Sequence, residues 1–209
     1  RVPLQVLIPC PRPSPVLGTA AMTHATILTP AEIGGIARRI DRPVVLVGLM
    51  GVGKSTVGRR LASMLDTDFV DVDEEIERAA NRSISEIFES HGEAYFRDGE
   101  RRVIARLMGE EHGIIATGGG AFVDPETRAV ILEKAIAVWL DCDIDTLVER
   151  TSRRNNRPLL RTGNPREILG ELKDRRSAAY AEAQIHVVTD NGPHAETAQR
   201  ILGAIDAWL

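Results

Sequence analysis

One short segment constrains this chain more than any other feature. Residues 48–55 read GLMGVGKS and fit the pattern G-x-x-x-x-G-K-[ST] at every fixed position. An apolar run over residues 43–47 precedes the segment, and a helical pattern from Lys54 to about Leu65 follows it. A strand, a glycine-rich loop and a helix in this order form the usual setting of a phosphate-binding P-loop. The chain is therefore predicted to be an α/β protein that binds a nucleoside triphosphate.

The residue types of this P-loop suit a phosphate for physical reasons. Glycines let backbone N–H groups turn inward around an anion, in conformations that a Cβ atom would obstruct. Lys54 is expected to reach the β- and γ-phosphates, and the Ser55 hydroxyl to ligate Mg²⁺. The loop alone does not distinguish a kinase from a GTPase or a motor. The predicted nucleotide contacts in the loop are Gly51, Val52, Gly53, Lys54, Ser55 and Thr56.

Beyond the P-loop, apolar runs that resemble strands alternate with helical patterns. Strands are predicted at residues 43–47, 68–71, 113–117, 136–140 and 185–189. Helices are predicted at residues 30–40, 54–65, 74–80, 84–90, 93–108, 125–134, 143–151, 164–182 and 194–209. Capping boxes at Thr29–Glu32 and Ser83–Glu86 support two of the helix starts. The alternation predicts a P-loop NTPase-type five-stranded parallel sheet flanked by helices, within a single domain over residues 29–209.

Residues 1–28 differ from the rest of the chain. They hold five prolines before residue 16, and no acidic residue precedes Glu32. One interpretation is a targeting segment, since transit peptides are poor in acids. The other is an extension upstream of a natural start at Met22, which we favour because the segment has few arginines and no amphipathic period. On either interpretation we expect a disordered extension outside the fold.

Composition restricts the partners. A net charge of −4 and an aromatic content of 4% argue against a surface for nucleic acid. The two cysteines, Cys10 and Cys142, belong to no metal or disulfide motif, which favours a reducing compartment. No apolar run approaches the ~18 residues that a membrane span needs. We therefore expect a cytoplasmic protein with no nucleic-acid or membrane partner. We also expect a monomer, although the sequence does not specify the oligomeric state.

The carboxylate that would support the metal must come from outside the third predicted strand, which ends in Thr117 and three glycines. The candidates are Asp71 and Asp73, at the end of the second predicted strand. Ligands of open parallel sheets bind at the carboxyl ends of the strands. Alternate side chains of a strand point the same way. Asp71 could then face the metal beside Ser55 while Asp73 faces an acceptor hydroxyl.

Further motifs follow in order over about residues 42–190. They are the P-loop with Thr56-Val57-Gly58, Asp71-Val72-Asp73 with Ile76-Glu77, Ser83-Ile84 with Ile87-Phe88, Gly92-Glu93 with Phe96-Arg97 and Glu100, Gly118-Gly119-Gly120, Arg157-Pro158-Leu159-Leu160, and Arg176 with Tyr180. No later motif is decisive alone, but the order and spacing of the set are highly specific. The set resembles that of the shikimate kinases.

The resemblance implies an enzyme that uses ATP and Mg²⁺ to phosphorylate a hydroxyl of shikimate, giving shikimate 3-phosphate for aromatic amino-acid biosynthesis. It implies that Asp73 hydrogen-bonds the shikimate hydroxyls and is the candidate base. Arg97 and Arg176 would clamp the carboxylate, which suits arginine because its guanidinium fork matches a carboxylate. The glycines at 118–120 would let the backbone approach the substrate ring.

The resemblance also implies a mobile lid over about residues 150–164. Arg157, on the lid, would close over the transferring phosphate and act in catalysis with Lys54 and Asp73. Arg150 would pack on adenine, with Pro193 in the loop that surrounds the base. A closing lid excludes water, which would otherwise hydrolyse ATP.

Simpler interpretations of these residues exist. Arg97 could form surface pairs with Glu93 and Glu100, and Asp71 or Asp73 could cap a helix. The glycine triplet could be a plain turn, and Arg175 could replace its neighbour Arg176. His91, His112, His186 and His194 have no clustered partners in the sequence and are interpreted as structural or solvated.

Two other functions compete with this interpretation. A gluconate or nucleoside monophosphate kinase would share the P-loop and a lid, but would not need Arg97, Arg176 and the glycine triplet at this spacing. A nucleotide-binding module without activity would not need to keep Lys54, Asp73 and Arg157 together.

Overall fold

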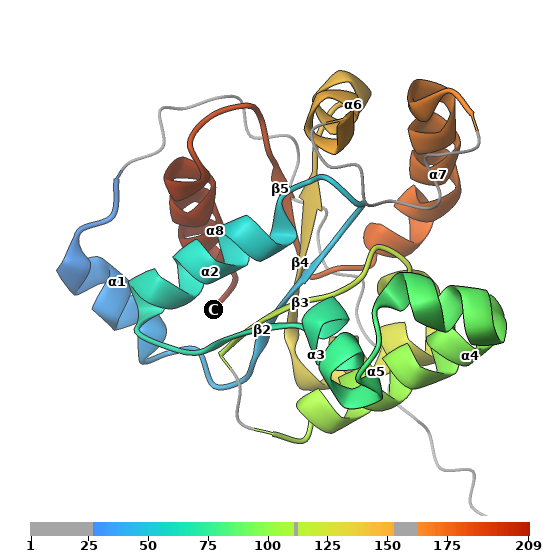
Figure 1. The fold of residues 1–209 in the computed structure, drawn as a ribbon. Helices are drawn as coiled ribbons and strands as arrows, with labels where there is room; N and C mark the ends of the chain where they lie inside the picture. The colour runs from blue at the N-terminus through green and yellow to red at the C-terminus, as the bar shows by residue number, and fades with distance from the viewer. Residues whose placement is uncertain (1–26, 111–112, 153–162) are drawn as a thin grey trace, which may run out of the picture.

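The computed structural model describes residues 27–110, 113–152 and 163–209. Its centre is one parallel sheet of five strands in the order β2-β3-β1-β4-β5 (Figure 1). The strands are β1 (Val44–Val47), β2 (Phe69–Asp71), β3 (Ile114–Ala116), β4 (Ile136–Asp141) and β5 (Ile185–Val188). The predicted five-stranded parallel sheet is confirmed, and the central β1 is buried along its whole length.

Helices cover both faces of the sheet. Helices α1, α2 and α8 pack together on one side, whereas α5 packs on β4 and also contacts α4 (Figure 1). The helices are α1 (Pro30–Ala37), α2 (Lys54–Leu65), α3 (Val72–Ala80), α4 (Ile84–Leu107), α5 (Pro125–Lys134), α6 (Ile144–Ser152), α7 (Pro165–Tyr180) and α8 (His194–Trp208), with a 3-10 turn η1 (Ala121–Val123).

Local sequence signals account for most helix boundaries. The capping boxes predicted at Thr29 and Ser83 are both formed. The two helices predicted on either side of residue 92 join into α4 at a kink, where Gly92 has φ 79° and ψ 176°. Helix α1 ends at Ala37, earlier than predicted.

The interpretation of Asp71 and Asp73 as alternate residues of one strand is wrong. Strand β2 ends at Asp71, and α3 begins at the next residue. The Asp71 carboxylate accepts a hydrogen bond of 3.0 Å from the backbone N–H of Asp73, and so caps the new helix. Asp73 therefore lies in the first helical turn.

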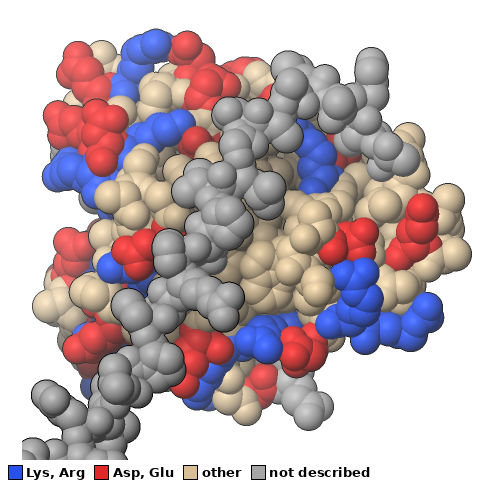
Figure 2. Space-filling view, turned by 180° about the vertical axis from the view of Figure 1, so that it is seen from behind, with Lys and Arg blue, Asp and Glu red and all other residues tan. Residues whose placement is uncertain are grey.

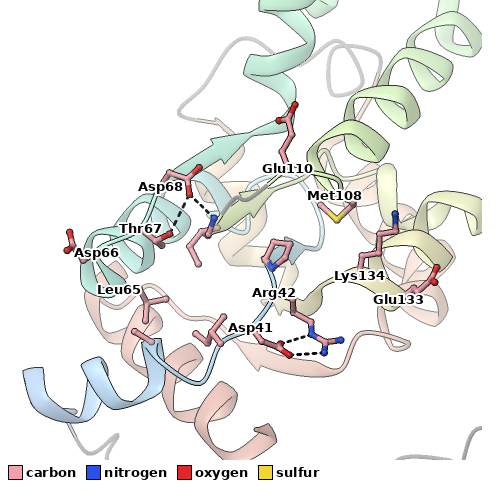
Figure 3. A pocket seen from close by; sticks show the side chains of 15 residues that line it. Asp41, Arg42, Leu65, Asp66, Thr67, Asp68, Met108, Glu110, Glu133 and Lys134 are labelled. Atoms are coloured by element: carbon pink, nitrogen blue, oxygen red, sulfur yellow. Dashed lines mark hydrogen bonds and ion pairs between the residues drawn. The ribbon is translucent and has the colours of Figure 1, made fainter.

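The two ends of the sheet carry different cavities. A cavity of about 870 Å³ lies at the amino ends of the strands, beside Pro43, Asp68 and Gly113. Figure 3 shows Asp41 paired with Arg42 there, and Asp68 accepting a hydrogen bond from the N–H of Gly113. None of the predicted site residues lines this cavity.

The outer surface shows no region of single charge on the face that Figure 2 presents. Basic and acidic side chains lie interspersed over the described residues of that face (Figure 2). Within the described ranges, no helix has both the length and the apolar character that crossing a bilayer requires.

Candidate active site

A cavity of about 1070 Å³ opens at the carboxyl ends of the strands. Its wall combines the P-loop with the β2–α3 junction, α4, the glycine triplet, α6, α7 and the start of α8. Most of the predicted site residues therefore come together in one place. Those that line the cavity are Gly51, Gly53, Lys54, Ser55, Thr56, Asp71, Asp73, Arg97, Gly118, Gly119, Gly120, Arg150 and Arg176.

Two predicted residues are not among those that line the cavity, and a third lies outside the described residues. Val52, within the P-loop, is buried. Pro193 is the N-cap of α8 and lies between Gly192 and His194, which do line the cavity. Arg157 lies outside the described residues, as do residues 153–162 of the predicted lid.

The backbone of the P-loop curls around the side chain of Lys54. Gly53 caps α2 with φ 102°, in the left-handed region that glycine tolerates. A Cβ atom on Gly48 would lie 2.3 Å from the backbone oxygen of Leu140, so the loop can pass β4 only with glycine there. The Lys54 ammonium donates to the carbonyls of Gly48 and Leu49, at 2.8 and 2.9 Å. It is thus held inside the concave loop, where a phosphate would bind.

Oxygen atoms suited to a hard cation meet beside the loop. The Ser55 hydroxyl donates a hydrogen bond of 2.6 Å to the Asp71 carboxylate. Mg²⁺ is usually held by one or two protein oxygens together with waters and substrate phosphates. No group of three or more His, Cys, Asp or Glu side chains in the described residues could hold a metal by itself. Ser55 and Asp71 therefore fit Mg²⁺ that arrives with a nucleotide.

Asp73 has an unusual titration behaviour for a carboxyl group. Burial, followed by the charges of Asp71 and Glu100, raises its pKa to about 6, and Lys54 opposes this shift. Such a group is ionised at neutral pH, yet takes up a proton far more readily than a solvated aspartate. It has the pKa of a general base that works near neutrality.

Each glycine of the triplet faces a different functional group. A Cβ atom on Gly118 would lie 2.6 Å from a carboxylate oxygen of Glu100 and 3.0 Å from one of Asp73. The corresponding atom on Gly119 would lie 3.5 Å from the Arg176 guanidinium, and on Gly120 it would lie 2.5 Å from that of Arg97. Absence of side chains at these positions keeps two carboxylates and two guanidinium groups around a common space.

The geometry separates Arg176 from its neighbour. Arg176 donates 2.9 Å to the carbonyl oxygen of Gly119 and lines the cavity. Arg175 pairs instead with Glu171 at 3.1 Å, with 68% of its side chain exposed. The structure therefore favours Arg176 for the position beside the triplet.

Glu100 is the residue whose importance the sequence understates. The sequence indicates it as a member of the motif set and as a surface partner of Arg97, to which it does bind at 2.7 Å. Its side chain is nevertheless 4% exposed, and its second carboxylate oxygen has no hydrogen-bond partner in the described residues. Burial raises the pKa of Glu100, and the charge of Arg97 opposes the shift. The i,i+3 spacing is visible in the sequence, but the burial is not.

The remaining part of the wall lies beside the P-loop, on α6 and the start of α8. Arg150 donates 3.1 Å to the carbonyl of Val52 and also donates to the carbonyl of Asp190. His194, interpreted from sequence as structural or solvated, is exposed on the cavity wall. If Gly53 carried a Cβ atom, the side chains of Arg150 and His194 would each lie 3.9 Å from it, so both are close to the P-loop.

Fold and cavity together define a P-loop kinase of the small-molecule type, in which a phosphate-binding loop and a charged acceptor pocket share one opening. A family model described as shikimate kinase matches residues 50–206. This chain belongs to the shikimate kinase family.

Individual relatives agree with this assignment. Shikimate kinase of Novosphingobium aromaticivorans is 64% identical over 193 residues, which cover 90% of this chain and 100% of the relative. Shikimate kinase of Caulobacter vibrioides is 58% identical over 164 residues, covering 78% of this chain and 82% of the relative. A structure of shikimate kinase from Acinetobacter baumannii in complex with shikimate matches with a TM-score of 0.77 and 39% identity, covering 79% of this chain and 93% of that one.

Proposed function

We propose that this protein transfers the γ-phosphate of ATP to a hydroxyl of shikimate, producing shikimate 3-phosphate and ADP for aromatic amino-acid biosynthesis. The observation that carries the proposal is the glycine triplet, bordered by Asp73, Arg176 and Arg97 in the same cavity as the P-loop. An acceptor with one carboxylate and neighbouring hydroxyls matches this set, because the two guanidinium groups can hold a carboxylate and the Asp73 carboxylate can accept a hydrogen bond from a hydroxyl. Family membership supports the same acceptor.

The acceptor side positions the hydroxyl and takes its proton. Arg97 and Arg176 bind the carboxylate of shikimate and so fix the orientation of the ring. Asp73 then faces the hydroxyls and accepts the proton of the attacking one. Its raised pKa makes proton uptake feasible at neutral pH.

The nucleotide side holds the phosphates and neutralises their charge. Backbone N–H groups of Gly51 and Gly53 and the Lys54 ammonium surround the phosphates, since phosphoryl transfer depends mainly on positioning and electrostatics. Ser55 and Asp71 would hold Mg²⁺, which when bound neutralises charge on the β- and γ-phosphates. Arg150 would contact the adenine.

Other expectations stay predictions. The catalytic role of Arg157 and the closure of a lid over 150–164 belong to residues that lie largely outside the described ranges. The contact of Pro193 with adenine rests on the family resemblance. Composition and sequence pattern support the single domain over 29–209, the cytoplasmic location and the lack of a nucleic-acid partner. The monomeric state stays an expectation, and the disordered extension predicted at 1–28 lies, apart from residues 27 and 28, outside the described residues.

The decisive experiment measures ADP release by the purified protein with Mg-ATP. Four parallel reactions contain shikimate, gluconate, a nucleoside monophosphate or no acceptor. We expect strong release with shikimate alone. Background release with shikimate but turnover with gluconate or a nucleoside monophosphate would show that the enzyme is a kinase for that other acceptor. No turnover with any acceptor would favour a nucleotide-binding module.

A further inference from the structure

We propose that Tyr180 is a positioning residue that fixes the Gly119–Gly120 peptide for acceptor binding. This inference rests on the proposed function, because it concerns the pocket that receives shikimate. Tyr180 does not line the cavity and is 1% exposed. It would therefore act through the backbone of the triplet and not by touching the substrate.

Two side chains of α7 donate to the same carbonyl oxygen. The Tyr180 hydroxyl and the Arg176 guanidinium both donate to the backbone oxygen of Gly119, the latter at 2.9 Å. The two residues are four positions apart, so they lie on one face of α7. Burial raises the pKa of Tyr180 to about 12, so the phenol remains a neutral donor throughout the working range of the enzyme.

This double hydrogen bond determines where the next N–H points. A trans peptide is planar, and its C=O and N–H point to opposite sides. Since the Gly119 carbonyl points toward Tyr180, the N–H of Gly120 points in the opposite direction within the same peptide plane, away from Tyr180. The N–H groups of Gly119 and Gly120 have no hydrogen-bond partner among the described residues. They are thus available to an anionic ligand in the cavity that both glycines line.

The same peptide also lies against the nucleotide loop. A Cβ atom on Gly119 would be 3.3 Å from the backbone nitrogen of Met50 and 3.5 Å from the oxygen of Gly48. The anchored carbonyl of Gly119 thus fixes the position of the acceptor pocket relative to the P-loop. Loss of one donor would loosen that peptide while Arg176 still holds it, so a partial effect is expected.

A buried tyrosine needs a hydrogen-bond partner for its hydroxyl even when it serves only the core. Tyr180 also packs near Trp139, with ring centroids 6.0 Å apart. The test must therefore separate lost stability from lost positioning. The chain offers a matched control, because its only other tyrosine is Tyr95, whose side chain is exposed on α4.

The experiment compares Tyr180→Phe with Tyr95→Phe and with Ile131→Val, which alters a fully buried core side chain on α5. Michaelis constants for shikimate and for ATP are measured together with Tm. Tyr180→Phe should raise the KM for shikimate by about three- to tenfold, the size of one hydrogen bond, and change the KM for ATP less than twofold. Neither control should alter the ratio of the two KM values, even where Ile131→Val lowers Tm.

Two outcomes would overturn the inference. One is a Tyr180→Phe protein with lowered Tm but an unchanged KM for shikimate. The other is a double variant, Tyr180→Phe with Arg176→Lys, whose change in KM for shikimate equals the product of the two single changes. Residues that share one acceptor atom should instead be coupled. Absence of shikimate-dependent turnover in the wild-type protein would instead overturn the proposed function, so the two failures are distinguishable.

Discussion

The backbone N–H of Asp73 donates a hydrogen bond of 3.0 Å to the carboxylate of Asp71. This contact ends β2, starts α3 and places two acids in the same cavity. Asp71 also accepts a hydrogen bond from the hydroxyl of Ser55, its partner in the proposed Mg²⁺ site. Asp73 lies beside Gly118 of the glycine triplet, where we propose that the acceptor binds.

Replacement of Asp73 by asparagine should remove the base while keeping the shape of the pocket. We expect kcat to fall by about 10²- to 10⁴-fold, the usual range for loss of a general base. The dissociation constant of ATP, measured by calorimetry, should change little. A variant that kept near-normal kcat would show that Asp73 is not the base.

The same replacement should stabilise the fold. The raised pKa means that the folded protein holds the Asp73 proton more tightly than the unfolded chain, so ionised Asp73 costs about 3 kcal/mol at pH 7. Asp73→Asn should therefore raise Tm at pH 7 by several degrees. The gain should be full above pH 6 and should shrink toward pH 3.8, below which the acid is protonated in both states. An equal gain at pH 4 and pH 7 would show that the buried charge of Asp73 is not its source.

The pH profile of the wild-type enzyme should report Asp73 directly. Since kcat/KM reflects groups of the free enzyme, its acid limb for shikimate should have a midpoint near pH 6. Activity is expected to fall as pH drops through that value, because the protonated carboxyl cannot accept the hydroxyl proton. A limb near pH 4, the range of a solvated aspartate, would argue against burial as the cause.

The adjacent arginines of α7 offer a sharp comparison. Arg176→Ala should raise the KM for shikimate at least tenfold with little change for ATP, because a charge-assisted hydrogen bond is worth about 1.5–3 kcal/mol. Arg175→Ala, which removes only an exposed pair with Glu171, should leave both constants within twofold. Arg97→Ala should behave as Arg176→Ala does, with Arg101→Ala as its exposed control on α4. Equal effects on shikimate and ATP would contradict a carboxylate clamp.

Gly120→Ala should impair the acceptor pocket through sterics alone. Its Cβ atom would lie 2.5 Å from the Arg97 guanidinium, which would have to move. We expect a raised KM for shikimate, and normal binding of ATP in calorimetry. The control is Gly99→Ala in α4, where a Cβ atom meets nothing within 4 Å and alanine should add up to about 1 kcal/mol of stability. Similar kinetics of the two variants would rule out the contact with Arg97.

Local patterns in the sequence were sufficient for the P-loop, the alternation of strands and helices, and the capping boxes at Thr29 and Ser83. These features depend on residues that are neighbours in the chain, where backbone preference and short-range hydrogen bonds decide the outcome. The motif set also indicated most residues of the cavity wall. Helix boundaries that depend on packing are less well predicted from local sequence, and the end of α1 at Ala37 is an example.

Only the tertiary structure decided which side chains face the cavity and how deeply they are buried. Arg176 differs from Arg175 because its guanidinium meets the carbonyl of Gly119, which lies 57 positions earlier in the chain. Glu100 and Asp73 owe their raised pKa values first to burial, which arises when separate segments pack around them. Sequence spacing specifies the order of the groups, whereas desolvation and distance depend on contacts between remote parts of the chain.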